Sequence, residues 1–219
     1  MPSQKKICIV DDHPVLRRGL SALIDSEPDL VVVGEADNSK AALEALQETR
    51  PDLAIVDLVL QGGDGLDLVK QIKALHPAIP TLVLSMHDEA TYAVRSLRAG
   101  ARGYVNKQQL DDTVLLAIRK ILSGDTYMSA QVESLLAARY IGGRTLDTDG
   151  PVAALSDRQL QVFRLIGEGR TTRQIAETLS LSIKTVESHR ENIKNKLTIE
   201  SSAELAERAV QWVATGQRR

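Results

Sequence analysis

The chain has 219 residues, of which 43 % are hydrophobic and 3 % aromatic, so a core built of Ala, Leu, Ile and Val is expected and full disorder is excluded. No apolar run approaches the roughly 20 residues of a membrane helix, no secretion signal is recognised, and the single cysteine, Cys8, excludes an intrachain disulfide, so we expect a cytoplasmic protein. Residues 1–124 hold 14 Lys and Arg against 17 Asp and Glu, whereas residues 151–219 hold 11 against 8. This balance permits nucleic-acid binding only at the C-terminal end.

Five short apolar runs alternate with amphipathic stretches of helical period in the first 124 residues. The runs are residues 7–10, 30–33, 53–56, 81–84 and 103–105, and helices are expected over residues 15–23, 41–46, 66–75, 92–97 and 114–122. Strands that alternate with helix-length segments indicate βαβ units. The sequence therefore predicts an α/β domain over residues 1–124, with a five-stranded parallel, doubly wound sheet of the flavodoxin-like type.

The alternation stops at residue 125. Residues 125–154 are expected to form a linker that contains one helix, over 129–140, followed by the glycines at 142–143 and the stretch 147–151. Residues 155–219 predict an all-α domain of four short helices. Hydroxyl side chains that can cap a helix open each of them, namely Ser156, Thr171 or Thr172, Ser182, and Ser201 or Ser202.

Polar side chains follow four of the predicted strands where each strand ends. These are Asp11 and Asp12, then Asp57, Ser85 and Lys107. The carboxyl ends of parallel strands share one edge of a sheet, so the five side chains should converge. Clustered carboxylates repel one another unless a cation joins them, and oxygen ligands suit Mg²⁺. The pattern favours a magnesium site in which Asp57 is a nucleophile for a phosphoryl group and Lys107 neutralises it.

The segments IVDDHP, IVDLVLQGGDG, LVLSMH and GYVNK resemble, in order and spacing, the signature segments of response-regulator receiver domains over about residues 5–122. The resemblance implies that a sensor histidine kinase phosphorylates Asp57. It also implies Mg²⁺ ligands at Asp11, Asp12 and Asp57 and at the backbone carbonyl of Val59. Ser85 and Lys107 match the phosphate-binding hydroxyl and lysine, and Tyr104 matches the aromatic residue that turns inward when Ser85 moves to the phosphate.

Two features of this region stand apart from the resemblance. Receivers usually have a proline four residues after the phosphorylated aspartate, whereas this chain has Gln61, which puts the rigidity of that loop in doubt. His13 follows the acidic pair and is expected to cap the first helix, and no histidine-based metal site is expected.

The segment from Leu155 to Leu197 resembles the LuxR-type helix-turn-helix. Val186, Ile193 and Leu197 form one apolar stripe, while hydrogen-bonding side chains occupy the other side of the same helix. A recognition helix needs this division, with donors and acceptors facing the major groove. The two resemblances together are typical of response regulators of the NarL/FixJ type.

The resemblance implies binding of double-stranded promoter DNA by residues at the start of the second of these helices and on the recognition helix: Thr171, Thr172, Lys184, Thr185, Glu187, Ser188, His189, Arg190, Lys194 and Lys196. Glu187 stands where many relatives have lysine, and a carboxylate can accept a hydrogen bond from cytosine. The last helix carries an apolar stripe that pairs two copies in relatives, so we expect a homodimer when the chain is phosphorylated or bound to DNA.

Two other interpretations were weighed against a phosphorylation-controlled transcription regulator. A phosphohydrolase of the haloacid dehalogenase type needs a second aspartate two residues after the nucleophile, and this chain has Val59 there, so no enzyme is expected. A phosphorylation-independent DNA-binding regulator with a structural receiver remains the alternative, although the complete acidic set and Lys107 count against it.

Overall fold

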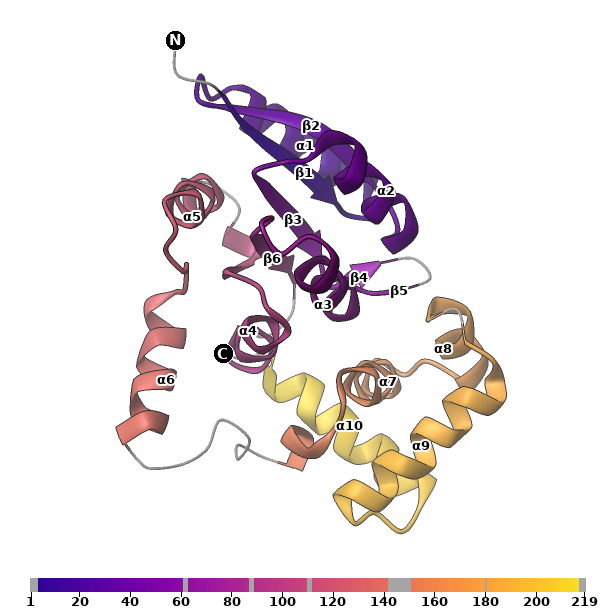
Figure 1. Ribbon diagram of the computed structural model, residues 1–219. Coiled ribbons are helices and arrows are strands. Elements are labelled where there is room, and N and C mark those ends of the chain that lie inside the picture. Colours follow the sequence, from indigo (N-terminus) through magenta and orange to yellow (C-terminus); the bar gives the residue numbers. More distant parts are fainter. Residues whose placement is uncertain are drawn as a thin grey trace. The chain divides into compact units, whose positions relative to one another are not determined.

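The computed structural model describes residues 4–60, 63–86, 89–109, 112–141, 151–179 and 181–216 (Figure 1). The chain divides into two compact units, Met1–Leu135 and Leu136–Arg219, and the division falls inside helix α6 (Ala130–Ile141). Gln61 and the glycines at 142–143, on which the predicted loop and linker depend, lie outside the described residues.

Five parallel strands form the sheet of the N-terminal unit, in the order β2-β1-β3-β6-β7. They are β1 (Lys5–Val10), β2 (Leu30–Ala36), β3 (Leu53–Asp57), β6 (Thr81–Ser85) and β7 (Gly103–Asn106). The strands alternate with α1 (Pro14–Asp25), α2 (Ser39–Thr49), α3 (Gly65–Leu75), α4 (Glu89–Ala99) and α5 (Asp112–Leu122). The predicted α/β class and the predicted five-stranded parallel sheet are therefore confirmed.

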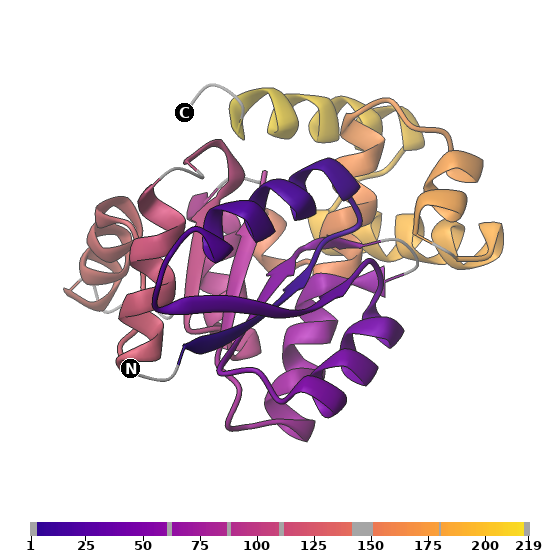
Figure 2. The same ribbon diagram turned by 90° about the horizontal axis from the view of Figure 1, so that it is seen from above.

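Helices cover both faces of this sheet (Figure 2). One face carries alternate strand residues such as Ile9, Ile55 and Leu84, and it packs against α1 and α5. The opposite face carries the intervening residues and is covered by α2, α3 and α4. Cys8 lies in the buried interior of β1, where burial raises the pKa of its thiol to about 11, so this cysteine stays protonated and acts as an apolar side chain.

Two details depart from the predicted elements. Strand β2 continues three residues past the predicted end at Val33, because an edge strand with one neighbour tolerates both Gly34 and the exposed Glu35. A short antiparallel pair, β4 (Val59–Leu60) and β5 (Gly63–Asp64), follows β3 and was not predicted, because two-residue strands leave no periodicity to detect.

In the described part of the C-terminal unit the regular elements are all helices, as predicted. A short 3₁₀ turn, η2 (Pro151–Ala154), precedes α7 (Asp157–Gly167), α8 (Thr172–Thr178), α9 (Ile183–Leu197) and α10 (Ser202–Gly216). The side chains of Ser156, Thr171 and Ser182 accept hydrogen bonds at the starts of α7, α8 and α9, which confirms three predicted caps.

Helices α7 and α10 pack closely in this unit. A Cβ at Gly167 would lie 2.4 Å from the carbonyl oxygen of Ala209, so only glycine allows this approach. Trp212 stacks at a tilt on Phe163, with ring centroids 5.8 Å apart. These contacts bury Leu205 and Ala209 of α10, while Val210 stays exposed.

Substitution of Gly65, the first residue of α3, is expected to destabilise the N-terminal unit strongly. A Cβ there would lie 2.1 Å from the carbonyl oxygen of Asp57 and 2.5 Å from the Cα of Leu58, and both are backbone atoms that cannot move aside independently. We expect Gly65→Ala to lower the free energy of unfolding of this unit by about 1–3 kcal/mol or more, measured by urea denaturation.

Gly19 provides the matched control for that substitution. It lies inside α1 with no atom within 4 Å of a built Cβ, so Gly19→Ala should raise stability by about 0.5–1 kcal/mol. Equal unfolding free energies for the two variants would contradict the proposed close contact at Gly65.

Candidate functional site

Four charged or polar residues lie at the carboxyl edge of the sheet. Asp11 follows β1, Asp57 ends β3, Ser85 ends β6 and Lys107 follows β7, so they come from four consecutive strands of the sheet order. All four are buried, with exposed fractions of 8 % or less. The convergence predicted from the strand ends is therefore present in the structure.

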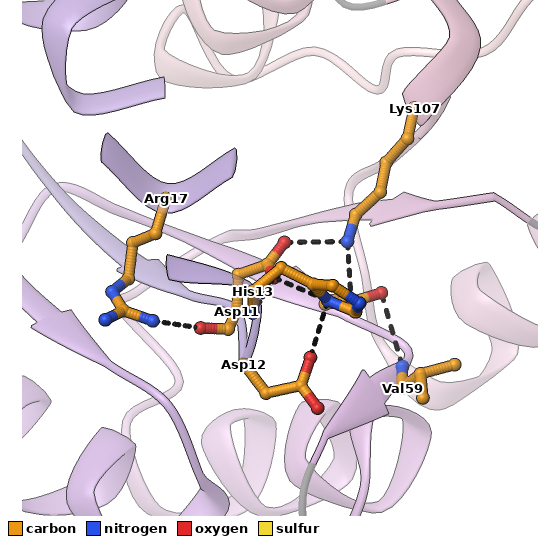
Figure 3. A network of polar contacts seen from close by, with 7 residues as sticks. Asp11, Asp12, His13, Arg17, Val59 and Lys107 are labelled. Atoms are coloured by element: carbon orange, nitrogen blue, oxygen red, sulfur yellow. Dashed lines mark hydrogen bonds and ion pairs between the residues drawn. The ribbon is translucent and has the colours of Figure 1, made fainter. Parts of the chain in front are cut away.

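Lys107 joins the two buried carboxylates. Its Nζ donates a hydrogen bond to Asp11 Oδ2 and another to Asp57 Oδ2, each 2.7 Å long (Figure 3). The second oxygen of Asp57 accepts a weaker hydrogen bond, 3.2 Å long, from the backbone amide of Val59. Buried charges are stable only when paired, so this ammonium is what allows Asp11 and Asp57 to lie together in the interior.

Burial also changes the acidity of Asp57. Removal of its carboxyl from water, with a smaller contribution from the nearby Asp11, raises the pKa of Asp57 to about 6 against the opposing effect of the Lys107 charge. The group is mainly ionised at neutral pH. It is therefore an anion in a largely dry pocket, where a nucleophile is poorly solvated and cationic partners act strongly.

Asp12 and His13 lie on the loop between β1 and α1. His13 Nδ1 is 2.7 Å from Asp12 Oδ1 and 3.3 Å from Asp11 Oδ1 (Figure 3). His13 occupies the N-cap position of α1, but its side chain makes no capping hydrogen bond, so the predicted capping role is wrong. The imidazole instead joins the acidic cluster, a contact that the sequence reasoning missed.

Arg17 is a second residue that the sequence reasoning missed. Its guanidinium donates a hydrogen bond of 2.6 Å to the backbone carbonyl of Asp11 and one of 3.0 Å to Glu35 on β2. Ser21 donates to the other oxygen of Glu35, 2.7 Å away. This chain of contacts fixes the loop that carries the acidic pair against the edge of the sheet.

The donor set of this pocket fits a hard divalent cation. Ligand atoms of Asp11, Asp12, His13 and Asp57 lie within 4.8 Å of one another. Asp12 Oδ1 lies 2.7 Å from His13 Nδ1 and, among the described residues, accepts no hydrogen bond from another group. Carboxylate oxygens in this number suit Mg²⁺, which keeps several waters in protein sites. Val59 contributes its amide to Asp57, and a role for its carbonyl remains a prediction.

Ser85 and Tyr104 lie beside this pocket in the sheet. Ser85 has no exposed surface, and its neighbour Leu84 pairs with Asp57 in the register of β3 and β6. Tyr104 pairs with Val83 and is only 1 % exposed, so in this structure the aromatic side chain already points inward.

Helices α8 and α9 form a helix-turn-helix in the C-terminal unit. Ile175, Leu179, Val186, Ile193 and Leu197 are all buried, so the predicted apolar stripe is present. Ser182 caps α9, with a hydrogen bond of 3.0 Å from the amide of Thr185, and its hydroxyl also lies 2.7 Å from that of Thr185. The tight, capped turn fixes the direction in which α9 leaves α8.

The first half of α9 presents free side chains to solvent. Lys184, Glu187 and Ser188 are exposed, and within the described part of the chain none of them makes a side-chain hydrogen bond or ion pair. His189 and Arg190 are half-buried, and burial, followed by the charge of Arg158, lowers the pKa of His189. These side chains are available to an external partner.

Other predicted DNA contacts have partners inside the chain. Lys196 Nζ donates hydrogen bonds of 2.9 Å to the carbonyl of Ala154 and to Gln159 Oε1. Lys194 lies 2.8 Å from Glu191, and the hydroxyl of Thr171 takes part in the capping box with Gln174. Lys196 therefore has a structural role that its sequence position did not indicate.

Two known protein families match this chain, one in each unit. The model of the response regulator receiver domain matches residues 7–119, and that of the bacterial regulatory proteins of the luxR family matches residues 153–209. The chain belongs to the response regulators with a LuxR-type DNA-binding domain. This identification confirms the family indicated by the sequence motifs.

Two relatives align with almost the whole length of this response regulator. The oxygen regulatory protein NreC of Staphylococcus haemolyticus is 36 % identical over 209 residues, which cover 94 % of this chain and 96 % of NreC. RcsB of Salmonella enterica serovar Typhimurium, solved on promoter rprA with the phosphomimetic BeF₃⁻, is 29 % identical with a TM-score of 0.65, over 94 % of this chain and 98 % of RcsB.

A third relative covers a smaller part of the chain. A LuxR-family two-component response regulator from Aurantimonas is 34 % identical with a TM-score of 0.59, over 64 % of this chain and 99 % of that structure. None of the helices within the described ranges is long and apolar enough to cross a membrane.

The raised pKa of Asp57 predicts a pH dependence of stability. The pKa of this carboxyl is about 6 in the folded chain and 3.8 when unperturbed. The protonated carboxyl therefore stabilises the folded chain below about pH 4, and this stabilisation is lost as the pH rises through 6. Between pH 4 and pH 7, without divalent cations, the wild type should lose up to about 3 kcal/mol of unfolding free energy relative to Asp57→Asn. Parallel pH profiles for the two proteins in urea denaturation would show that Asp57 titrates normally.

Proposed function

We propose that this response regulator receives a phosphoryl group on Asp57 from a sensor histidine kinase and thereby gains affinity for promoter DNA. The observation that carries the proposal is Lys107, whose ammonium bridges Asp57 and Asp11 in a buried pocket. We assign residues 1–124 to the phosphoryl-accepting receiver domain, residues 125–154 to the linker and residues 155–219 to the DNA-binding domain. A cytoplasmic location remains a prediction.

The geometry supports phosphoryl transfer in the following way. An oxygen of Asp57 forms a bond to phosphorus while the bond from phosphorus to the donor's imidazole nitrogen breaks, and that nitrogen takes up a proton. Lys107 lies 2.7 Å from Asp57 and can follow the negative charge onto the phosphoryl oxygens. The mainly ionised state of Asp57 at neutral pH supplies the nucleophile without a separate general base.

Mg²⁺ held by Asp11, Asp12, Asp57 and the carbonyl of Val59 would neutralise charge that develops on the transferred group. Asp12 supports this assignment because a carboxylate oxygen of it lies within 4.8 Å of ligand atoms of Asp11 and Asp57. Ser85, at the end of β6 and therefore on the strand next to β3, is proposed to bind a phosphoryl oxygen. Tyr104, already buried, would be held in its inward position once Ser85 binds the phosphoryl group, so phosphorylation would act on a side chain of β7, the strand that precedes Lys107.

The DNA reader is assigned to the exposed side of α9. Lys184, Thr185, Glu187, Ser188, His189 and Arg190 are proposed to face the major groove or its rim, and Thr171, Thr172 and Lys194 to face phosphates. RcsB structures support this assignment by relationship, since they include one with a promoter and a phosphomimetic and one with two dimers on two parallel DNAs. A homodimer on DNA is proposed for this chain on the same ground.

The first test of this function is phosphorylation with acetyl phosphate and Mg²⁺, followed by intact mass. The wild type should gain one phosphoryl group, and Asp57→Asn should gain none, because its amide cannot attack phosphorus. The phosphorylated wild type should bind promoter DNA at least about tenfold more tightly, a typical size for an allosteric coupling.

Uptake of phosphate by Asp57→Asn at the wild-type level would refute the assignment of the acceptor. Equal DNA affinity of the phosphorylated and unphosphorylated proteins would instead favour the alternative of a regulator that binds DNA independently of phosphorylation. The two measurements therefore separate the chemistry from its coupling to DNA.

The second test compares two lysines on one helix by salt titration on a non-specific duplex. Lys194→Ala should reduce the slope of log affinity against log salt concentration by about 0.9, the value for one phosphate contact. Lys196→Ala should leave the slope unchanged but lower the free energy of unfolding of the C-terminal unit by about 1–3 kcal/mol, since it leaves Gln159 and the Ala154 carbonyl without their ammonium donor. The reverse pattern would show that Lys196 leaves its internal acceptors to bind DNA.

A further inference from the structure

One large apolar side chain lies among the free polar side chains at the start of α9. Ile183 is the first residue of this helix and is 49 % exposed. Lys184 follows it directly, and Glu187 lies one turn further along on the same side, because residues four apart in a helix stand one above the other. Both polar residues are exposed and make no side-chain bond within the described residues. Ile183 is therefore continuous with the surface that the proposed function assigns to DNA.

Packing inside the domain does not account for an apolar side chain at this position. The stripe that holds α9 in place consists of Val186, Ile193 and Leu197, which are at most 6 % exposed, whereas Ile183 leaves about half of its surface in water. Val210 is the other exposed large apolar side chain in the described part of this unit, and it belongs to α10, the helix expected to pair two copies. Isolated apolar side chains are common on protein surfaces, so the argument for Ile183 depends on its neighbours in the reader.

The backbone around Ile183 is fixed by the cap of α9. The hydroxyl of Ser182 accepts a hydrogen bond of 3.0 Å from the amide of Thr185, and the two hydroxyl groups lie 2.7 Å apart. Ile183 lies between these two residues. A β-branched side chain also has few accessible rotamers, so little conformational entropy is lost when it makes a contact. Ile183 is thus suited to a contact of fixed direction with a small apolar group.

We propose that Ile183 reads one thymine of the operator through van der Waals contact with the 5-methyl group of that base. The proposal rests on the proposed function, because it requires α9 to enter the major groove. The N-terminal residues of a recognition helix contact base edges, and the methyl group of thymine is the apolar group that these edges present in the major groove. Cytosine lacks this methyl group, so an aliphatic side chain distinguishes the two pyrimidines without a hydrogen bond.

The test begins with full-length protein phosphorylated with acetyl phosphate and Mg²⁺, which selects DNA from a duplex library with a randomised core. The enriched duplex is then resynthesised with uracil in place of one thymine at a time, a change that removes only the methyl group. At one position, uracil should weaken binding by the wild type about fourfold, the effect of one buried methyl group. Ile183→Ala should bind the thymine and uracil forms of that duplex equally. Ile183→Val, which stays β-branched, should retain the preference for thymine.

Leu75 provides the apolar control, because it ends α3 in the other unit and is 62 % exposed. Leu75→Ala should respond to uracil as the wild type does. The proposal is overturned if no thymine methyl group affects the wild type, if Ile183→Ala keeps the full response, or if Leu75→Ala loses it. Failure of the wild type to enrich any sequence would overturn the DNA-reading part of the proposed function as well. A selected sequence that is insensitive to both uracil and Ile183→Ala would overturn the thymine contact alone.

Discussion

The ammonium of Lys107 is the interaction on which the phosphorylation site depends. Asp11 and Asp57 are nearly inaccessible to water, and two carboxylates in that position repel each other and lose their hydration. One cation 2.7 Å from both removes much of this cost. Because Lys107 follows β7 while Asp11 follows β1, the ion pairs reach from one side of β3 to the other, and the strand order β1-β3-β6-β7 brings their partners together. The order of the sheet and the chemistry of its edge therefore support each other.

The same edge is held from outside by contacts that add no group to the chemistry. Arg17 ties the carbonyl of Asp11 to Glu35, and Gly65 allows α3 to begin directly against the backbone of Asp57. The side chain of Asp64 caps α3 through the amide of Leu66. A nucleophile needs a fixed direction of approach, and these backbone contacts supply it on both sides of the pocket.

Much of the fold and of the pocket could be predicted because both follow from short-range patterns. Strand and helix periods placed the carboxyl ends of β1, β3, β6 and β7 on one edge, and hydroxyl residues marked the caps of α7, α8 and α9. The remaining features depend on contacts between distant parts of the chain or on side-chain direction. Lys196 looks solvent-facing by period, yet its long side chain reaches Gln159, which is 37 residues away in the sequence. His13 follows a strand as a cap residue would, and only the structure shows its imidazole turned toward the acidic pair.

Helix α9 shows how one short helix can combine structure and recognition. Its apolar stripe and the Lys196 contacts fix its position against α7 and η2, so its C-terminal half carries bonds inside the domain. Its first half carries Lys184, Glu187 and Ser188, which are exposed and make no side-chain bonds within the described residues. A side chain without a structural role can change without loss of stability, whereas one that holds the helix cannot. The specificity of such a reader can therefore evolve at the start of α9, while its orientation is preserved at the end.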